Sequence, residues 1–479
     1  MAGPAPSPDT VVAIINKATG EDNNHVKELL GLVASLPAAE QDNARPSFVT
    51  NVFLLVFRDK AFVQGSSDYE LQRPQTAGSN PSSSSPPLTS QHVAAALSLC
   101  VFFSTKFSVR GGGHLNHPGA NSNDGGVVIS LTEFNQVQLS NGKSTAGIGV
   151  GLRWRDVYKA LEPHGLAVAG GRVPSVGVPG LILGGGISFQ NSQYGVGAMG
   201  IVNYETSSGA LRGGGSNFGI VTKLEILTLP NHIWCEARVY PQPVYDSLIA
   251  ALMQYHDAIE SNDKATLIWY SNEAILLVPA PAPAVFAPFF DVPSLQNLVV
   301  PRFRAVYDLA QGIADVVSTE VKLYEFRTMS SRPSLKLYKA IDEALAEQAA
   351  ALHDVEGISI TTVFQPVSSL AMQKSADSPL GLDPVGQQWL FAMGECKHST
   401  DEPRVRDAIK KIVDVAESTA RKEGVWLRYK YINYAARDQA ALGSYGVKNV
   451  ERLKVIARRY DPKSVFQELQ GGGVAAWES

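Results

Sequence analysis

A histidine at the end of a glycine run is the first feature of this sequence that could do chemistry. Gly111, Gly112 and Gly113 stand between Arg110 and His114. Glycine has no Cβ, so such a run can turn tightly and lets a ligand approach the backbone. Successive N–H groups in a turn can also converge on an anion. His114 has the chemistry of a base, a metal ligand or a point of covalent attachment. Taken alone, the run equally fits a surface turn with an incidental histidine.

Two further glycine runs, Gly184–Gly186 and Gly213–Gly215, follow in the same part of the chain. Backbone N–H groups exposed by such runs suit the pyrophosphate of a nucleotide cofactor. The alternative is that the runs are only packing turns. Three runs in one region make that alternative less attractive, but the runs by themselves do not name a cofactor.

Other motifs in the sequence argue against several common kinds of site. Gly195–Gly200 fits G-x-G-x-x-G, but no convincing strand precedes it, which disfavours a nicotinamide Rossmann site. His114 and His117 lack a third ligand and an H-E-x-x-H pattern, so we predict no metal site. The three cysteines are far apart in the sequence and indicate neither a disulfide framework nor a zinc site.

The composition is that of an ordinary globular protein. The 479 residues carry 41 basic and 45 acidic side chains, for a net charge of -4. No basic block suggests nucleic acid as a partner, and no apolar run is long enough to span a membrane. The N-terminus lacks the basic start and apolar core of a secretory signal, so we expect a cytoplasmic protein. Secretion is the alternative if the true start differs.

Helices and strands are mixed along the chain, which predicts an α+β fold. Glycine runs stop at about Asn231 and resume only at Gly471–Gly473, so we expect a domain boundary near residue 230. Longer elements follow, including helices near Val244–Ile259 and Val405–Lys422. Upstream, the patterns predict a helix over Val26–Leu36, a loop over Gly78–Pro87, a helix after Thr89, a strand over Lys106–Val109 and a strand over Phe218–Leu229.

The order of several separate motifs resembles the berberine bridge enzyme-like branch of the vanillyl-alcohol oxidase flavoproteins, and fungal members most of all. These motifs are Arg110–His114, Gly170–Arg172, Val176–Val178, Leu183–Ser188, Leu211–Val221 and Tyr431–Tyr434. The resemblance implies a PCMH-type FAD-binding domain of two subdomains over residues 1–230. It also implies a substrate domain with an antiparallel sheet over 231–430, and a segment over 431–479 that returns to the FAD domain.

The resemblance also implies which residues hold the cofactor. His114 matches the histidine that bonds covalently to the flavin, and a neutral imidazole nitrogen is a suitable nucleophile. Val173 stands where doubly tethered members carry a cysteine, so we expect a linkage through His114 only. Val176 matches a position where valine accompanies access for oxygen. The other expected FAD contacts are Gly111, Gly112, Gly113, Gly177, Gly219, Ile220, Val221 and Asn433.

On the substrate side, the resemblance makes Tyr431 the candidate base and Gln365 a candidate substrate contact. An unperturbed tyrosine has a pKa of about 10, so Tyr431 needs nearby positive charge or hydrogen bonds to act as a base at neutral pH. Lys430 and Arg428 are the nearest cations in the sequence. Without the resemblance, Tyr431–Tyr434 fits an ordinary strand with aromatic side chains.

These residues together predict an FAD-dependent oxidase acting on a small organic alcohol, amine or phenolic in secondary metabolism, with O2 as the second substrate and H2O2 as co-product. One alternative is a non-catalytic or degenerate homologue, because the chain passes almost directly from Glu205 to Leu211. In the family a strand stands between these positions, so we expect this chain to lack it. Another alternative is a carbohydrate oxidase of the same fold.

Overall fold

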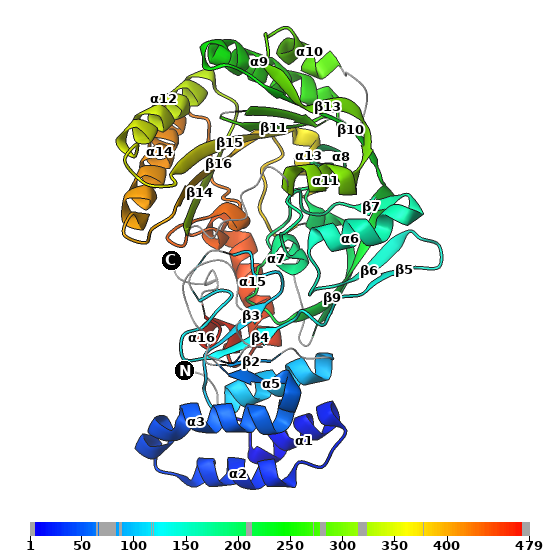
Figure 1. Cartoon of the computed structure of the whole chain (residues 1–479), viewed down its shortest axis with the longest axis vertical. Coiled ribbons are helices and arrows are strands. Elements are labelled where there is room, and N and C mark those ends of the chain that lie inside the picture. Colours follow the sequence, from blue (N-terminus) through cyan, green and yellow to red (C-terminus); the bar gives the residue numbers. More distant parts are fainter. Residues whose placement is uncertain are drawn as a thin grey trace.

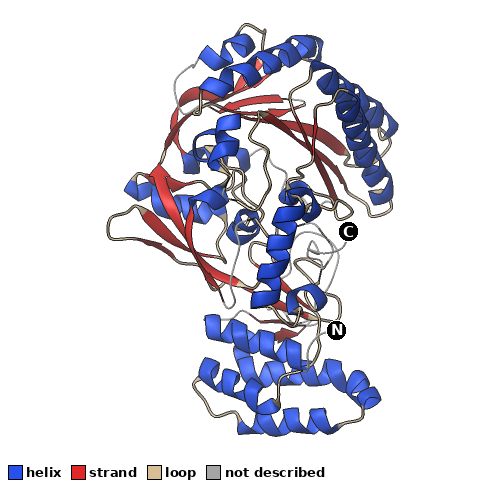
Figure 2. Cartoon of the chain, turned by 180° about the vertical axis from the view of Figure 1, so that it is seen from behind, coloured by secondary structure: helices blue, strands red, loops and turns tan. Residues whose placement is uncertain are grey.

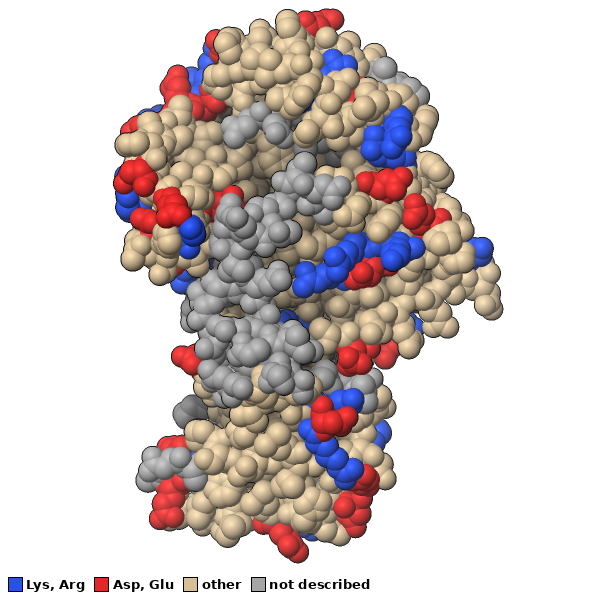
Figure 3. All heavy atoms as spheres, in the orientation of Figure 1, with Lys and Arg blue, Asp and Glu red and all other residues tan. Residues whose placement is uncertain are grey.

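The computed structural model describes residues 5–63, 66, 83–85, 89–115, 117, 119–206, 213–271, 273–277, 284–314, 323–376 and 378–471. Three sheets and the helices packed on them make up this part of the chain (Figure 1). The predicted α+β fold is confirmed. Most described residues on the face in Figure 3 are uncharged, and the Lys and Arg there lie near Asp and Glu without a large surface of one sign. Among the described helices, none combines the length and apolarity that a bilayer-spanning segment requires.

Four helices form the N-terminal end of the molecule (Figure 1). In α2, Val26, Leu30 and Val33 recur at helical spacing, and all three are buried. The side-chain oxygens of Ser7 and Thr89 cap α1 and α5 by accepting from backbone N–H groups. The four helices are α1 (Pro8–Thr19), α2 (Asn24–Ser35), α3 (Ala38–Phe57) and α5 (Ser90–Phe102).

The first sheet positions the first glycine run. Its strands follow the order β1-β2-β4-β3, and β3 pairs in parallel with β4 from Phe107↔Val127 onward. The predicted loop over Gly78–Pro87 is wrong for Ser83–Ser85, which pair with β4, since ladder hydrogen bonds come from the backbone. The rest of that stretch lies outside the described residues. The strands are β1 (Phe62–Val63), β2 (Ser83–Ser85), β3 (Phe107–Arg110) and β4 (Val127–Ser130).

The second sheet surrounds β9, which pairs antiparallel with β6, β7 and β8. Within the described residues β8 pairs with β9 alone, and its last pair is Thr206↔Val221. The loss of a strand after Glu205 stays a prediction. The elements are β5 (Val137–Leu139), β6 (Thr145–Gly149), α6 (Trp154–Leu161), β7 (Leu166–Val168), α7 (Val178–Leu183), α8 (Asn191–Tyr194), β8 (Ile201–Thr206) and β9 (Val221–Pro230).

The third sheet has eight antiparallel strands in the order β13-β10-β12-β11-β15-β16-β14-β17. Helices α9, α12 and α14 cover one face of it (Figure 1) and share an apolar core with it. The elements are β10 (His232–Val239), α9 (Tyr245–Ala258), β11 (Thr266–Tyr270), β12 (Glu273–Leu277), α10 (Ala287–Phe290), β13 (Gln296–Ala305), α11 (Val306–Ala314), β14 (Leu323–Ser331), α12 (Leu335–Ala351), β15 (Ser359–Val367), α13 (Ser369–Lys374), β16 (Gln387–Cys396), α14 (Glu402–Lys422) and β17 (Trp426–Leu427).

The C-terminal segment leaves the third sheet and reaches the first. Helices α15 (Val447–Tyr460) and α16 (Val465–Glu468) lead to Gln470, which forms a parallel bridge with Phe107 at the edge of β3. The strand predicted over Tyr431–Tyr434 is wrong, because Ile432–Tyr434 form one turn of 3-10 helix. Tyr431 and Tyr434 therefore do not alternate across a sheet, and the Tyr434 N–H instead donates to the Tyr431 carbonyl.

Candidate functional site

The first glycine run lies directly against the loop that contains Val176 and Gly177. A Cβ built on Gly112 would lie 2.3 Å from the Cα of Gly177, and one built on Gly111 would lie 2.6 Å from the side chain of Pro179. Only glycine allows the two backbones to approach this closely. The structure thus brings together two segments that the sequence analysis assigned to the same cofactor.

His114 ends this run beside two polar residues. Its Nε2 lies 3.2 Å from the Ser175 hydroxyl, and the Arg153 guanidinium donates to the Ser175 carbonyl at 2.7 Å. The His114 side chain is in part exposed to solvent, but the protein atoms near its ring still lower its pKa, the charge of Arg153 lowers it further, and a backbone hydrogen bond partly opposes both. Both effects favour the neutral imidazole, which is the form that can act as a nucleophile.

The second glycine run meets the C-terminal segment through Asn433. A Cβ on Gly184 would lie 2.0 Å from Asn433 Oδ1. The Asn433 amide donates to the Leu181 carbonyl at 3.0 Å and to the Tyr431 hydroxyl at 2.9 Å. Asn433 therefore connects the glycine-rich loop to the predicted base.

The third glycine run is held by the same segments. The Tyr445 hydroxyl donates to the Gly213 carbonyl at 2.8 Å, and the Gly215 N–H donates to the Leu183 carbonyl at 2.9 Å. All three runs thus lie in one region, called the glycine cradle below, where Gly184–Gly186 are buried against other segments. Gly111–Gly113 are partly exposed, so N–H groups of this run could reach the anionic part of FAD. Gly219, with φ +149°, and Ile220 lead into β9, which Val221 begins.

On the substrate side, an arginine from the FAD-binding half joins two residues from elsewhere in the chain. One guanidinium nitrogen of Arg172, Nη2, donates to Gln365 Oε1 at 2.6 Å and to the Tyr434 hydroxyl at 2.8 Å. Gln365 lies on β15 and is 3% exposed. In the sequence, Arg172 stands out only as part of the Gly170–Arg172 motif. One arginine beside two glycines gives no signal of a substrate site before the fold brings Gln365 to it.

Stacked aromatic rings line the same place. Tyr434 stacks on Phe391 with ring centroids 4.2 Å apart, and Tyr431 stacks on Trp389 at 5.5 Å. The two tyrosine rings meet edge to face at 4.7 Å. Burial raises the pKa of Tyr431 well above that of an ordinary tyrosine, and Tyr434 adds to the rise. The Asn433 hydrogen bond and the Arg172 charge offset only part of it.

The cation that acts on Tyr431 is not one of its sequence neighbours. Lys430 pairs with Glu417 at 2.8 Å, and the Arg428 side chain donates to the Ser444 carbonyl at 2.9 Å. Arg172 supplies the positive charge instead. Arg172 is distant from Tyr431 in the sequence, and its charge offsets only part of the effect of burial on the Tyr431 pKa, so the role of Tyr431 as a base stays a prediction.

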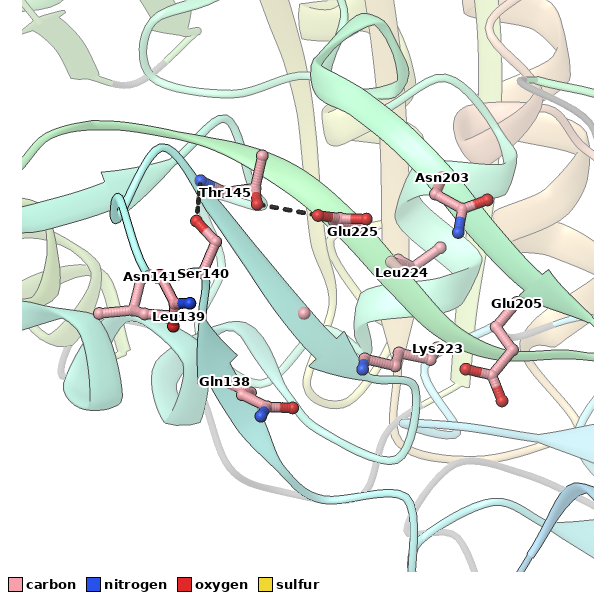
Figure 4. A pocket seen from close by; sticks show the side chains of 11 residues that line it. Gln138, Leu139, Ser140, Asn141, Thr145, Asn203, Glu205, Lys223, Leu224 and Glu225 are labelled. Carbon is pink, nitrogen blue, oxygen red and sulfur yellow. Dashed lines mark hydrogen bonds between the residues drawn. The ribbon is translucent and has the colours of Figure 1, made fainter.

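A separate hollow of about 330 Å³ lies over the polar face of the second sheet (Figure 4). Lys223, Glu205 and Glu225 line it, and the Thr145 hydroxyl donates to Glu225 at 2.9 Å. None of the site residues described above lines this hollow. Within the described ranges, no group of three His, Cys, Asp or Glu side chains could hold a metal ion.

Comparisons with known proteins match this chain to FAD-dependent proteins. An FAD binding domain model matches residues 86–209. An FAD-dependent monooxygenase of Arthrobotrys oligospora is 32% identical over 432 residues, which are 84% of this chain and 84% of the relative. The bifunctional solanapyrone synthase of Alternaria solani is 27% identical over 428 residues, 83% of this chain and 82% of that enzyme.

Solved structures share the fold at low sequence identity. The 6-hydroxy-D-nicotine oxidase of Arthrobacter nicotinovorans superposes with a TM-score of 0.72 at 18% identity, covering 86% of this chain and 97% of that one. A variant of berberine bridge enzyme superposes with a TM-score of 0.70 at 16% identity, covering 86% and 96%. The identity to the Arthrobotrys relative over most of both chains shows that this chain belongs to the same family of FAD-dependent oxidoreductases, and it shares the fold of berberine bridge enzyme.

Proposed function

We propose that this protein is an oxidase of secondary metabolism that oxidises a small organic alcohol, amine or phenolic and carries FAD covalently on His114. The observation that carries the proposal is the position of His114. The residue ends a glycine loop packed against Val176 and Gly177, it contacts the Ser175 hydroxyl, and the charge of Arg153 favours its neutral form. The name of one relative, solanapyrone synthase, supports a role in secondary metabolism.

The glycine cradle would hold the pyrophosphate and His114 the flavin ring. When bound, FAD accepts a hydride from a substrate carbon and passes the electrons to O2. The chain's own residues would orient the substrate and take its proton. Tyr431 is the proposed base, supported by Asn433 and by the charge of Arg172. Gln365, held by Arg172, is the proposed substrate contact.

The first test is an absorbance spectrum of purified protein with acid precipitation. We expect yellow protein whose flavin stays with the precipitated chain. His114→Ala should release the flavin into the supernatant, because no other nucleophile is proposed for the linkage. His117→Ala is the matched control, since His117 binds the Ala435 carbonyl at 3.1 Å and should not affect the linkage. Colourless wild-type protein would favour a degenerate homologue.

A monooxygenase is the second candidate function, because the Arthrobotrys relative is named one. The two reactions differ in the fate of oxygen. An oxidase releases H2O2 and adds no oxygen atom to its product, whereas a monooxygenase incorporates one atom of O2. Incubation under isotopically labelled O2, with peroxide assay and product mass, separates them. A panel of alcohols, amines and phenolics beside oligosaccharides also tests the carbohydrate alternative.

A further inference from the structure

We propose that Arg172 and Gln365 form a binding site for an anionic oxygen, so that the enzyme selects planar substrates carrying a carboxylate or phenolate group. The inference rests on the proposed function, because it assigns a substrate class to that same site. Two observations support it: the hydrogen bonds that these two residues form, and the N–H groups on them that have no partner among the described residues.

Arg172 retains unused donors. A guanidinium has five N–H groups, and both printed contacts, to Gln365 and Tyr434, come from Nη2. Over the described part of the chain, Nε and Nη1 have no partner, and neither is fully enclosed by protein. No described carboxylate forms an ion pair with Arg172. The Arg172 guanidinium therefore keeps its positive charge without a described carboxylate as counter-ion, next to the Tyr434 ring.

Gln365 supplies a second donor. Its Oε1 accepts from Arg172, which fixes the orientation of the amide, since a guanidinium can only donate. Its Nε2 is buried and has no hydrogen-bond partner among the residues that the structure describes. Leaving a buried donor unpaired is costly, and such a group is normally matched by a partner. An oxygen of the substrate would satisfy it.

The rings beside these donors favour a flat molecule. Phe391 and Tyr434 are stacked, and Tyr431 meets Tyr434 edge to face. A planar ring can stack on such a surface while an anionic oxygen on it meets the guanidinium. Hydrogen bonds to charged partners are roughly twice as strong as neutral ones, so the charge should decide selectivity.

The test is calorimetric titration of the FAD-loaded protein with benzoate and with its neutral match, benzamide. We expect benzoate to bind more tightly than benzamide. Arg172→Gln should weaken benzoate by roughly tenfold or more and leave benzamide nearly unchanged, because a charged hydrogen bond is lost. Arg172→Lys should keep part of the preference. Gln365→Leu should weaken both ligands. Arg452→Gln, on the exposed face of α15, is the matched control.

A second pair of probes tests the phenolate group separately from the carboxylate group. Pentafluorophenol, which is ionised at neutral pH, replaces benzoate, and pentafluorobenzene is its neutral match. Preference for either anion that disappears in Arg172→Gln supports the proposal. Equal binding of anionic and neutral probes by wild type overturns it. Loss of FAD from Arg172→Gln without loss of the anion preference also overturns the proposal, because Arg172 would then bind the cofactor and not the substrate. Absence of flavin from wild type contradicts the proposed function instead.

Discussion

At the scale of single residues, the site depends on positions where a side chain cannot be present. Gly112 faces Gly177 backbone to backbone, and Gly184 leaves the space that the Asn433 amide occupies. Each contact joins a loop of the FAD-binding half to another segment of the site. A methyl group on Gly112 would force its backbone away from that of Gly177, and one on Gly184 would displace the Asn433 side chain, so both close approaches require glycine.

Gly112→Ala should disrupt the cofactor site. The added Cβ would lie 2.3 Å from the Gly177 Cα, a distance at which backbone atoms must shift. Such overpacking costs about 1–3 kcal/mol, and we expect lower FAD content and a lower Tm. Gly142→Ala, where nothing lies within 4 Å, is the control and should change neither. Wild-type flavin content in Gly112→Ala would contradict this packing.

His256 should make stability depend on pH. Burial lowers its pKa to about 3, while its Nε2 lies 2.9 Å from the Tyr338 hydroxyl. In the unfolded chain a histidine has a pKa of about 6.5. As pH falls from about 6.5 toward 3, the unfolded state gains a proton that the folded state does not. Stability is therefore lost, by up to about 1.4 kcal/mol per pH unit.

His256→Gln should flatten this dependence. Urea unfolding at several pH values between about 6.5 and 4 would measure it, because urea midpoints report the free energy of unfolding. His353→Gln, at an exposed position on the surface, is the matched control and should keep the wild-type slope. An unchanged slope in His256→Gln would assign the acid sensitivity to other groups.

At the scale of elements, the segment after Tyr434 docks on β14 by polar contacts. Gln439 accepts from the Thr328 N–H at 3.1 Å and donates to the Thr328 carbonyl at 2.8 Å. It also accepts from the Ala436 N–H at 3.0 Å. Arg327 also forms an ion pair with Asp438, in which Nη2 donates to Oδ1 at 2.5 Å and to Oδ2 at 2.7 Å. These contacts set where Tyr431–Tyr434 stand relative to the third sheet.

Gln439→Leu should destabilise this docking. It leaves the Thr328 N–H and carbonyl and the Ala436 N–H without their partner, and an unpaired buried group costs about 1–3 kcal/mol. We expect a lower Tm and weaker activity through misplacement of the two tyrosines. Gln254→Leu, exposed on α9, should be neutral. A Tm equal to wild type in Gln439→Leu would show that Asp438 alone holds the segment.

At the scale of the whole molecule, the chain returns from the third sheet to the first (Figure 2). The Phe107 N–H donates to the Leu469 carbonyl, and the Phe107 carbonyl accepts from the Gly471 N–H. Phe466 packs edge to face on Phe107 with centroids 5.9 Å apart. The C-terminal residues therefore complete the sheet whose β3 strand carries the first glycine run.

A chain ending at Tyr460 should lose FAD binding and unfold at lower temperature. It lacks α16 and the residues paired with Phe107, which exposes one edge of β3 and the core position of Phe466. A chain ending at Gly471 keeps both and is the control. Flavin retention by the shorter chain would show that the first sheet is complete without this segment.

Sequence alone determined what local chemistry and motif order can determine. Glycine runs, the histidine after Arg110, and the periodic helices depend on neighbouring residues, so α2, α9 and α14 were predicted close to their observed bounds. The family and its cofactor follow from the order of separate motifs. The pairing of Ser83–Ser85 was missed because backbone hydrogen bonds leave no side-chain pattern.

Only the tertiary structure decided which groups meet. Arg172, Gln365 and Tyr434 come from three distant segments, and their hydrogen bonds depend on how β15 and the turn at Ile432–Tyr434 approach the glycine-rich loop. The residues beside Tyr431 in the sequence point to other partners. Contacts between remote segments are set by packing of whole sheets and helices, and no local pattern encodes them. The position of the Arg172 charge beside Gln365 and Tyr434 therefore became visible only in the fold.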